Sequence, residues 1–310
     1  MAETKLDPQM EAYLKKAEKV GLPPIDKLTP QEARRIRNPF MKETGGPPEP
    51  VARVEDLRAT GLQGFIPLRL YTPQGRGPFP ILVYFHGGGW LLGDLETHDS
   101  LCRSLANRGS CVVALVDYSL APEHPFPAAV EDAYAATRWI SKHAGQISGD
   151  PSRIAVGGDS SGGNLAAVVC LIARERKEPA LVFQLLVYPV MNLSSFANRS
   201  YKEYGDKYTL TRNEMEYIRR NYLKQEEEAR NPYVSPLLAE NLSNLPPALV
   251  ITAECDVLTD EAKAYADRLK AAGVPVTYVS YEGLIHGFFR LGNSIDRARE
   301  ALNSFSTVTF

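Results

Sequence analysis

Residues 153–167 read RIAVGGDSSGGNLAA, and this stretch decides the fold. Its apolar start, at 153–157, predicts a buried strand, and the pattern over 162–176 predicts a helix. Between them, two serines are flanked by glycines on both sides. Glycine weakens regular structure, so glycines in these places need a local reason. We interpret the stretch as a sharp turn from a strand into a helix.

The turn matches the pattern G-x-S-x-G, which in a strand-to-helix context lifts one serine hydroxyl out as a nucleophile. Ser160 has glycine two residues before and two residues after it, whereas Ser161 has Asp159 two residues before it. We therefore predict that Ser160 is the nucleophile. The N–H groups at the start of the following helix favour negative charge there. The alternative interpretation is a glycine-rich turn in which a serine caps the helix.

From residue 51 onward, strands and helices alternate along the chain. Strands such as ALVITA (248–253) are apolar on both faces, which is typical of a parallel sheet covered by helices on both sides. We predict an α/β fold with a mostly parallel central sheet, begun by a few antiparallel strands. The expected strands are 51–58, 66–72, 80–85, 111–117, 153–157, 181–188, 248–253 and 276–281. The expected helices are 8–21, 29–36, 127–144, 162–176 and 260–272.

One segment lies outside this alternation. Residues 190–230 separate two core strands and are more numerous than a crossover requires. We expect this insertion to form a helical cap together with the N-terminal segment. The predicted organisation is 1–45 for the N-terminal part of the cap, 46–189 for the core, 190–230 for the cap insertion and 231–310 for the rest of the core.

The stretch ILVYFHGGGW (81–90) leads an apolar strand directly into three glycines. Consecutive glycines are costly in backbone entropy, which favours a role in presenting bare N–H groups to an oxyanion. We expect the N–H groups of Gly88, Gly89 and Ser161 to be the donors, and His86 to hold the loop. The alternative is a flexible hairpin loop. Neither glycine-rich pattern of nucleotide-binding loops fits this sequence.

A serine nucleophile needs a general base, which is usually histidine. Of the five histidines, His286 in GLIHGFF directly follows the last expected strand, where a loop at the carboxyl edge of the sheet would deliver it. His124 lies in a proline-rich loop and His86 precedes the glycines. His98 and His143 are expected to lie in solvated helical segments. We predict that His286 is the base.

The acid of the triad is expected after the preceding strand, in AECDVLTDEA (253–262). Asp256 is the best candidate to orient the imidazole. Glu254 fits a solvated loop position. Asp260 and Glu261 fit the first turn of a helix capped by the preceding threonine.

Together these pieces resemble the bacterial and archaeal hormone-sensitive lipase-like carboxylesterases, which have the α/β-hydrolase fold. The matching segments are HGGGW (86–90), GDLETHD (93–99), DYSLAPEHPFPAAVEDA (117–133), GGDSSGGNLAA (157–167), CDVLTDE (255–261) and IHGF (285–288). The resemblance implies a Ser160–Asp256–His286 triad and the oxyanion donors named above. It also implies hydrolysis of short- to medium-chain carboxylic esters through an acyl-enzyme, without a cofactor or metal. The chain departs from the family pattern at Ser119, Ser161 and Val257.

Two other functions share this fold. A non-catalytic small-molecule receptor is disfavoured because such receptors lack the histidine that stands here at His286. An amidase or lipase variant stays open, although the charged sequence over 212–230 does not suggest an apolar lid.

The composition indicates an ordinary globular protein, with 44% hydrophobic and 23% charged residues. The net charge of −2 gives no electrostatic reason to expect binding to nucleic acid or to an anionic membrane. The cysteines show no C-x-x-C spacing, which argues against a zinc site and a disulfide scaffold. The charged N-terminal sequence does not resemble a signal peptide, so we expect a cytoplasmic protein. We expect a small-molecule ester as partner, and a homodimer stays open.

Overall fold

The computed structural model describes residues 5–62 and 64–306. Eight strands form one sheet in the order β1-β2-β4-β3-β5-β6-β7-β8. They are β1 (Arg53–Thr60), β2 (Phe65–Thr72), β3 (Phe79–Phe85), β4 (Val112–Val116), β5 (Gly149–Asp159), β6 (Phe183–Val187), β7 (Ala248–Cys255) and β8 (Val276–Ile285). The β1–β2 and β2–β4 pairs are antiparallel and the others are parallel. The predicted α/β-hydrolase sheet is therefore confirmed.

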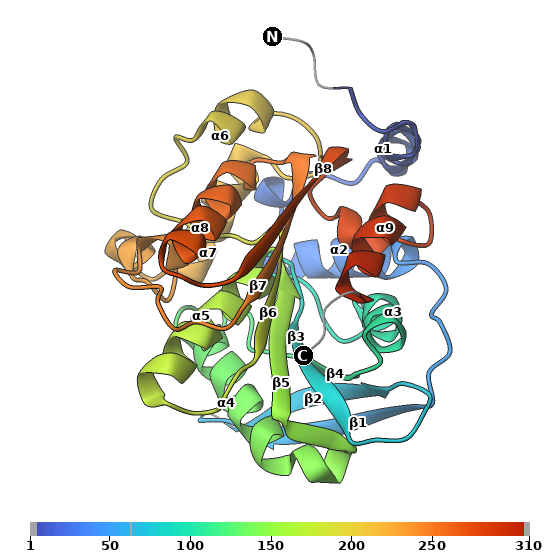
Figure 1. Ribbon diagram of the computed structural model, residues 1–310. Coiled ribbons are helices and arrows are strands. Elements are labelled where there is room, and N and C mark those ends of the chain that lie inside the picture. Colours follow the sequence, from blue (N-terminus) through green and yellow to red (C-terminus); the bar gives the residue numbers. More distant parts are fainter. Residues whose placement is uncertain (1–4, 63, 307–310) are drawn as a thin grey trace.

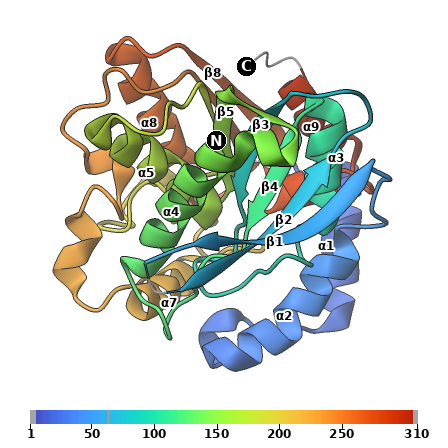
Figure 2. The same ribbon diagram turned by 90° about the horizontal axis from the view of Figure 1, so that it is seen from below.

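Helices cover both faces of this sheet. Figure 1 shows α3 (Asp99–Gly109) and α9 (Asp296–Ser306) on one face, and α4 (Ala128–His143), α5 (Ser161–Arg176) and α8 (Thr259–Ala271) on the other. All residues of β4 and β6 are buried between these layers, as expected for strands that are apolar on both faces. Figure 2 shows how far the sheet twists between β8 and β1.

Two of these helices, α3 and α9, are absent from the helix ranges expected from the sequence. Both bury a narrow apolar stripe among polar residues. In α9 the buried residues are Ala298, Ala301, Leu302 and Phe305, which have helical spacing. The helical spacing of apolar residues was therefore present in the sequence of α9, but two of these residues are alanines, which makes the pattern weak.

The N-terminal segment contains α1 (Pro8–Val20) and α2 (Pro30–Thr44), joined through a short 3-10 turn, η1 (Ile25–Lys27). The helix expected at 29–36 therefore continues to Thr44, through a proline inside it. The 190–230 segment contains α6 (Arg199–Tyr204) and α7 (Arg212–Tyr222). The other 3-10 turns are η2 (Ala144–Ile147), η3 (Glu226–Arg230), η4 (Pro236–Leu238) and η5 (Phe288–Leu291).

The two segments contact each other. The backbone N–H of Ile25 donates to Oε1 of Glu214 at 3.3 Å, and the hydroxyl of Tyr217 donates to the carbonyl of Leu28 at 2.8 Å. The N-terminal turn η1 is thus attached to α7, although about 190 residues separate them in the chain.

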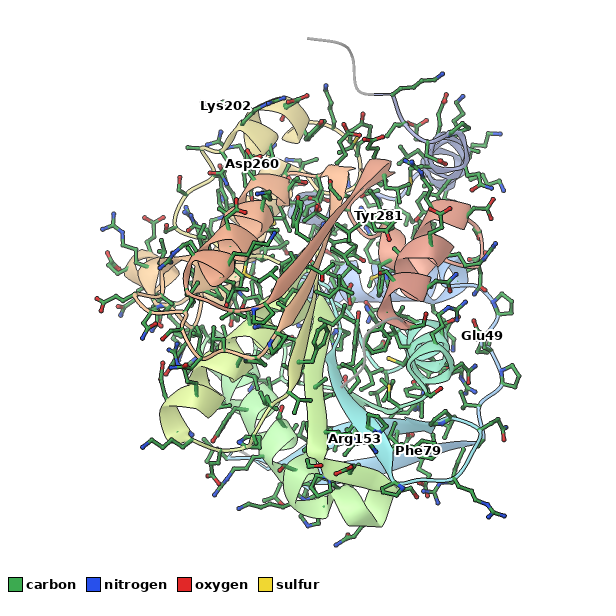
Figure 3. All side chains as sticks on the ribbon, viewed as in Figure 1. Glu49, Phe79, Arg153, Lys202, Asp260 and Tyr281 are labelled. Atoms are coloured by element: carbon green, nitrogen blue, oxygen red, sulfur yellow. The ribbon has the colours of Figure 1, made fainter. Side chains whose placement is uncertain are left out.

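The proline-rich stretch after α2 is clasped onto the core by Glu49, which lies beside α3 in Figure 3. Its carboxylate accepts hydrogen bonds from Ser104 Oγ at 2.6 Å and Asn107 Nδ2 at 3.0 Å, and pairs with Arg108 at 2.8 Å. Although partial burial raises the pKa of Glu49, these partners bring it to about 2. The carboxylate is therefore charged, and it anchors the chain where the core begins.

Candidate active site

Ser160 stands at the turn between β5 and α5, with φ 57° and ψ −118°. A non-glycine residue in this region of backbone space is strained, and such strain is common at functional sites. Two backbone bonds hold it. The N–H of Ser160 donates to the carbonyl of Val187 at 2.9 Å, and its carbonyl accepts from the N–H of Val190 at 3.2 Å. The end of β6 therefore fixes the turn.

The glycines around Ser160 are required by close approach of the backbone. A Cβ on Gly158 would overlap the backbone of Gly162, and a Cβ on Gly162 would overlap the carbonyl of Phe85. Neither neighbour is the end of a flexible side chain that could move aside. The tight turn can therefore form only with glycine at both positions.

The structure brings Ser160, His286 and Asp256 together. Nε2 of His286 lies 3.0 Å from Oγ of Ser160, and Nδ1 of His286 lies 2.7 Å from Oδ2 of Asp256. Because a carboxylate only accepts hydrogen bonds, Nδ1 carries the imidazole proton, and Nε2 accepts from the serine hydroxyl. The other Asp256 oxygen, Oδ1, accepts from the N–H of Leu258 at 3.0 Å. These side chains stand at the carboxyl ends of β5, β7 and β8, the edge where ligands bind in such sheets.

Two neighbours of Asp256 differ from expectation. Glu254 belongs to β7, and its carboxylate accepts from the N–H of Gly283 at 2.8 Å, so it is not a solvated loop residue. Thr259 does not cap the next helix. It is the first residue of α8, and its hydroxyl donates back to the carbonyl of Ala253 at 2.5 Å. Both side chains brace the turn that carries Asp256.

The two acidic residues in the first turn of α8 do more than favour the helix end. Asp260 accepts from the N–H of Ser200 at 2.8 Å. Glu261 is buried, and its Oε1 accepts from the N–H groups of Met191 at 2.7 Å and Asn192 at 3.1 Å. Burial raises the pKa of Glu261 to about 8. Both acidic side chains tie α8 to the segment that begins after β6, which the expectation of a simple helix start did not include.

The glycine loop after β3 contains two residues with positive φ, a conformation that favours glycine. Gly88 and Gly89 have φ of 133° and 63°, and a Cβ on Gly88 would overlap the carbonyl of Leu92. Within residues 5–62 and 64–306, neither N–H of this pair donates to another protein atom. Ser161 begins α5, so its N–H has no acceptor within the helix. These are the three N–H groups expected to face an oxyanion.

A carboxylate that the sequence analysis assigned no role connects this loop to the nucleophile turn. Asp159, next to the serine, accepts from the N–H of Gly87 at 3.1 Å and from the hydroxyl of Tyr84 at 3.0 Å. His98 Nε2 lies 3.2 Å from the same carboxylate. His98 is completely buried, so the expectation of a solvated helical histidine was wrong. The sequence contained one indication of this contact. An aspartate in a buried, glycine-flanked turn needs polar partners, and a histidine can be one of them.

The electrostatics of this network favour a fixed, charged Asp159. Burial raises its pKa, but His98, the charge of Arg290 and the Tyr84 hydroxyl lower it to about 2. His86 has the structural position that we expected. It is buried, its Nδ1 donates to the carbonyl of Gly87 at 3.0 Å, and its ring stacks on Tyr118 at 4.3 Å. Burial and the nearby His98 lower the pKa of His86 to about 4, so it is neutral at neutral pH.

The remaining two histidines lie away from the nucleophile. His124 is exposed in its loop. His143 ends α4, is half-buried, and stacks on Trp139 with ring centroids 4.1 Å apart. It is therefore less solvated than expected.

Ser160 and His286 open into a cavity of about 170 Å³. Its opposite walls come from α1, α2 and α7, including Tyr13, Phe40 and Ile218. A larger cavity of about 390 Å³ lies beside α4 and α5, but it contains none of the predicted site residues. Chemistry rather than size therefore identifies the candidate site.

Among the described residues, no group of three or more histidine, cysteine, aspartate or glutamate side chains is placed to hold a metal ion. The four cysteines are buried and free. In the same residues, no helix combines the length and the apolar character needed to cross a membrane.

Comparisons with known proteins agree with this geometry. A family model described as the alpha/beta hydrolase fold matches residues 82–290. The chain is 42% identical over 295 residues to the carboxylic ester hydrolase LipN of Mycobacterium tuberculosis, covering 92% of this chain and 77% of the relative. It is 38% identical over 284 residues to an arylesterase of Saccharolobus solfataricus, covering 91% and 92%. Among solved structures, it is similar to a Pyrobaculum calidifontis esterase, with a TM-score of 0.89, 41% identity and 97% coverage of both chains.

Proposed function

Because the chain belongs to the α/β-hydrolase family, in its hormone-sensitive lipase-like carboxylesterase branch, we propose that it is a serine carboxylesterase with Ser160 as nucleophile. One observation carries the proposal. Ser160, His286 and Asp256 form a continuous hydrogen-bonded chain that ends in a cavity beside unpaired N–H groups. This is the arrangement that acyl transfer through a serine requires.

The reaction follows from these contacts. As Oγ of Ser160 attacks the ester carbonyl carbon, Nε2 of His286 takes its proton, and Asp256 stabilises the imidazolium that results. The carbonyl oxygen becomes an oxyanion. When the intermediate collapses, the C–O bond to the alcohol breaks and His286 gives its proton to the leaving oxygen. Water then attacks the acyl-enzyme with His286 again as base, which releases the acid and restores Ser160.

The N–H groups of Gly88, Gly89 and Ser161 are the proposed oxyanion donors. Donors that are already oriented in a site shielded from water stabilise the transition state without rearranging during the reaction. Asp159 supports this role because it binds the N–H of Gly87, at the start of the glycine loop. It thereby fixes the loop relative to the serine that follows it in the chain.

We propose that residues 1–45 and 190–230 form a cap that limits the length of the acyl group. The support is that both segments line the same cavity and contact each other through η1 and α7. Ile218 lies against the glycine loop, where a Cβ on Gly89 would come within 2.7 Å of it. A cavity of this size suits short- to medium-chain esters.

An active-site phosphonate tests the nucleophile directly. A p-nitrophenyl alkylphosphonate should release about one equivalent of p-nitrophenolate per chain, because one serine reacts once. Peptide mass mapping should place the alkylphosphonyl group on Ser160, and Ser160→Ala should not react. A label on Ser161, or stoichiometric release by Ser160→Ala, would refute the assignment.

Two further expectations concern the whole molecule. β8 is an edge strand of the sheet and is partly exposed over 276–282, and we propose this edge as the contact surface of a homodimer. Sedimentation analysis at several concentrations tests it, and a monomer throughout would refute it. We also propose a cytoplasmic location, which cell fractionation tests.

A further inference from the structure

Two arginines stand in the wall of the catalytic cavity. Arg37 comes from α2 and Arg290 from η5, and both line the cavity together with Ser160 and His286. Both guanidinium groups also act on Tyr13, a third lining residue. Burial raises the pKa of Tyr13, and the positive charges of Arg290 and Arg37 oppose that rise. The two charges therefore converge on one part of the cavity.

Neither arginine forms a direct ion pair, although the charge of Arg290 helps to lower the pKa of Asp159. Arg37 donates from Nη2 to the carbonyl of Pro23 at 2.9 Å, and Arg290 donates from Nη1 to the carbonyl of Met41 at 2.9 Å. Within the part of the chain that the structure describes, neither takes part in an ion pair, and Nε of Arg37 is buried with no hydrogen-bond partner. A guanidinium has five N–H donors, so most of this donor capacity is unused.

Arg34, one turn earlier on α2, shows the contrast. It pairs with the carboxylate of Glu123 at 2.7 Å and also donates to the carbonyls of Leu91 and Ala121, both at 2.7 Å. This arginine is a structural residue that satisfies its donors within the protein. The difference between Arg34 and Arg37 is therefore local and is not a general property of this helix.

The carboxylates that line the same cavity are already occupied. Glu214 accepts from the N–H groups of Thr211 at 3.0 Å and Ile25 at 3.3 Å. Asp159 accepts from Gly87 and Tyr84 and faces His98, and the more distant charge of Arg290 also lowers its pKa. Arg37 thus has a buried donor with no partner in the protein, and Arg290 beside it has no carboxylate within ion-pair distance. A buried polar donor without a partner is unfavourable, which points to a partner supplied by the ligand.

We propose that the natural substrate is an ester that carries a carboxylate, which Arg37 and Arg290 bind while Ser160 attacks the ester group. The inference rests on the proposed carboxylesterase function and adds a substrate class to it. A guanidinium binds a carboxylate through charge-assisted and often paired hydrogen bonds. Two of them, carried by different elements of the wall, would hold the anion and set the distance between the carboxylate and the bond that breaks.

Matched ester pairs test the proposal. Methyl hexanoate and monomethyl adipate differ only in a terminal methyl or carboxylate on the acyl side, and hexyl acetate and 6-acetoxyhexanoate differ likewise on the alcohol side. Hydrolysis is followed by acid release at constant pH. We expect the wild type to hydrolyse one of the two anions with a kcat/KM at least equal to that of its neutral partner. The pair that shows this identifies the side of the ester that bears the carboxylate.

Variants then assign the effect to the arginines. Arg37→Met and Arg290→Met should each lower the anion-to-neutral ratio of kcat/KM by about 10-fold, the usual size for a hydrogen bond to a charged group. Arg37→Lys should recover part of it. Arg35→Met removes the same charge from an exposed position on α2 and should leave the ratio unchanged. Circular dichroism checks that each variant is folded.

The possible outcomes distinguish failure of the carboxylate-binding proposal from failure of the carboxylesterase function. An enzyme that hydrolyses the neutral esters but discriminates 10-fold or more against both anions keeps its carboxylesterase function and overturns this inference. An equal fall of the ratio in Arg35→Met would overturn it too, because the effect would then be one of net charge. Failure on all four esters, with no phosphonate label on Ser160, would overturn the proposed function itself.

Discussion

The two sides of the catalytic cavity are held in different ways. On the side of the sheet, Ser160 and Asp256 are fixed by backbone hydrogen bonds at strand ends, and the glycines beside Ser160 leave no space for movement. On the opposite side, α2 and α7 are joined to their surroundings mainly through side chains such as Glu214 and Tyr217. We infer from this difference that the two sides have different roles in the reaction. The sheet side sets the rate of the chemical step, and the helical side selects the ester.

The largest effect should come from the centre of the rigid side. Ser160→Ala should lower kcat by about 10⁵–10⁶-fold, because it removes the attacking atom. Ser161→Ala is the matched control. It removes a hydroxyl one residue away but keeps the proposed N–H donor, and should cost less than about 10-fold. Steady-state kinetics on a chromogenic butyrate ester measures both. Equal losses in the two variants would contradict the geometry of the turn.

The next largest effect concerns the orientation of the base. Asp256→Asn should lower kcat by about 10⁴-fold, because an amide would favour the wrong tautomer of His286. Glu254→Gln is the control from the same strand, since Glu254 contacts Gly283 and not the imidazole. If Glu254→Gln were the more damaging change, the acid would have to be reassigned.

The difference between the sheet side and the helical side also explains which features of the site could be predicted from the sequence. On the sheet side, the chemistry of Ser160, Asp256 and His286 depends on local patterns and on their order along the chain, and the structure places them together as expected. All eight strands were also predicted, and the buried parallel strands β3 to β7 were the clearest because such strands are apolar runs.

Contacts between distant segments could not be read in this way. The burial of His98 depends on Asp159, 61 residues away, and Glu261 binds backbone groups 69 and 70 residues away. A charged residue near a helix end has the same local pattern whether it meets solvent or a buried N–H group. The unpaired state of Arg37 was equally hidden, because Arg34 on the same helix is fully paired.

Glu261 joins the two sides and should give a smaller effect, on stability. Its pKa in the folded protein is about 8, above the ordinary value for glutamate, because it is buried. Between these two values the folded state holds a proton that the unfolded state has released, so stability falls as the pH rises. From pH 5 to pH 8 the wild type should lose about 4 kcal/mol at most through this group.

Glu261→Gln cannot titrate at this position and should lose correspondingly less stability over the same range. Urea unfolding of both proteins at pH 5 and pH 8 measures the difference, in which the other titrating groups cancel. Parallel losses in the two proteins would show that Glu261 is not protonated in the folded state.

The smallest effect belongs to the helical side and concerns selectivity. In the wild type, kcat/KM should rise from acetate to butyrate or hexanoate esters and fall for palmitate, because methylenes contribute only while they fit the cavity. Ile218→Ala should enlarge the cavity beside the glycine loop and raise the preference for the longer ester by about fourfold per additional methylene accommodated, the equivalent of about 0.8 kcal/mol. Deleting residues 1–45 should flatten the profile further and lower stability, since it exposes the apolar faces beneath. Val20→Ala, at an exposed position of α1, is the control. A palmitate preference in the wild type, or an unchanged profile in Ile218→Ala, would mean that the helical side does not select the ester, and the division between the two sides would fail.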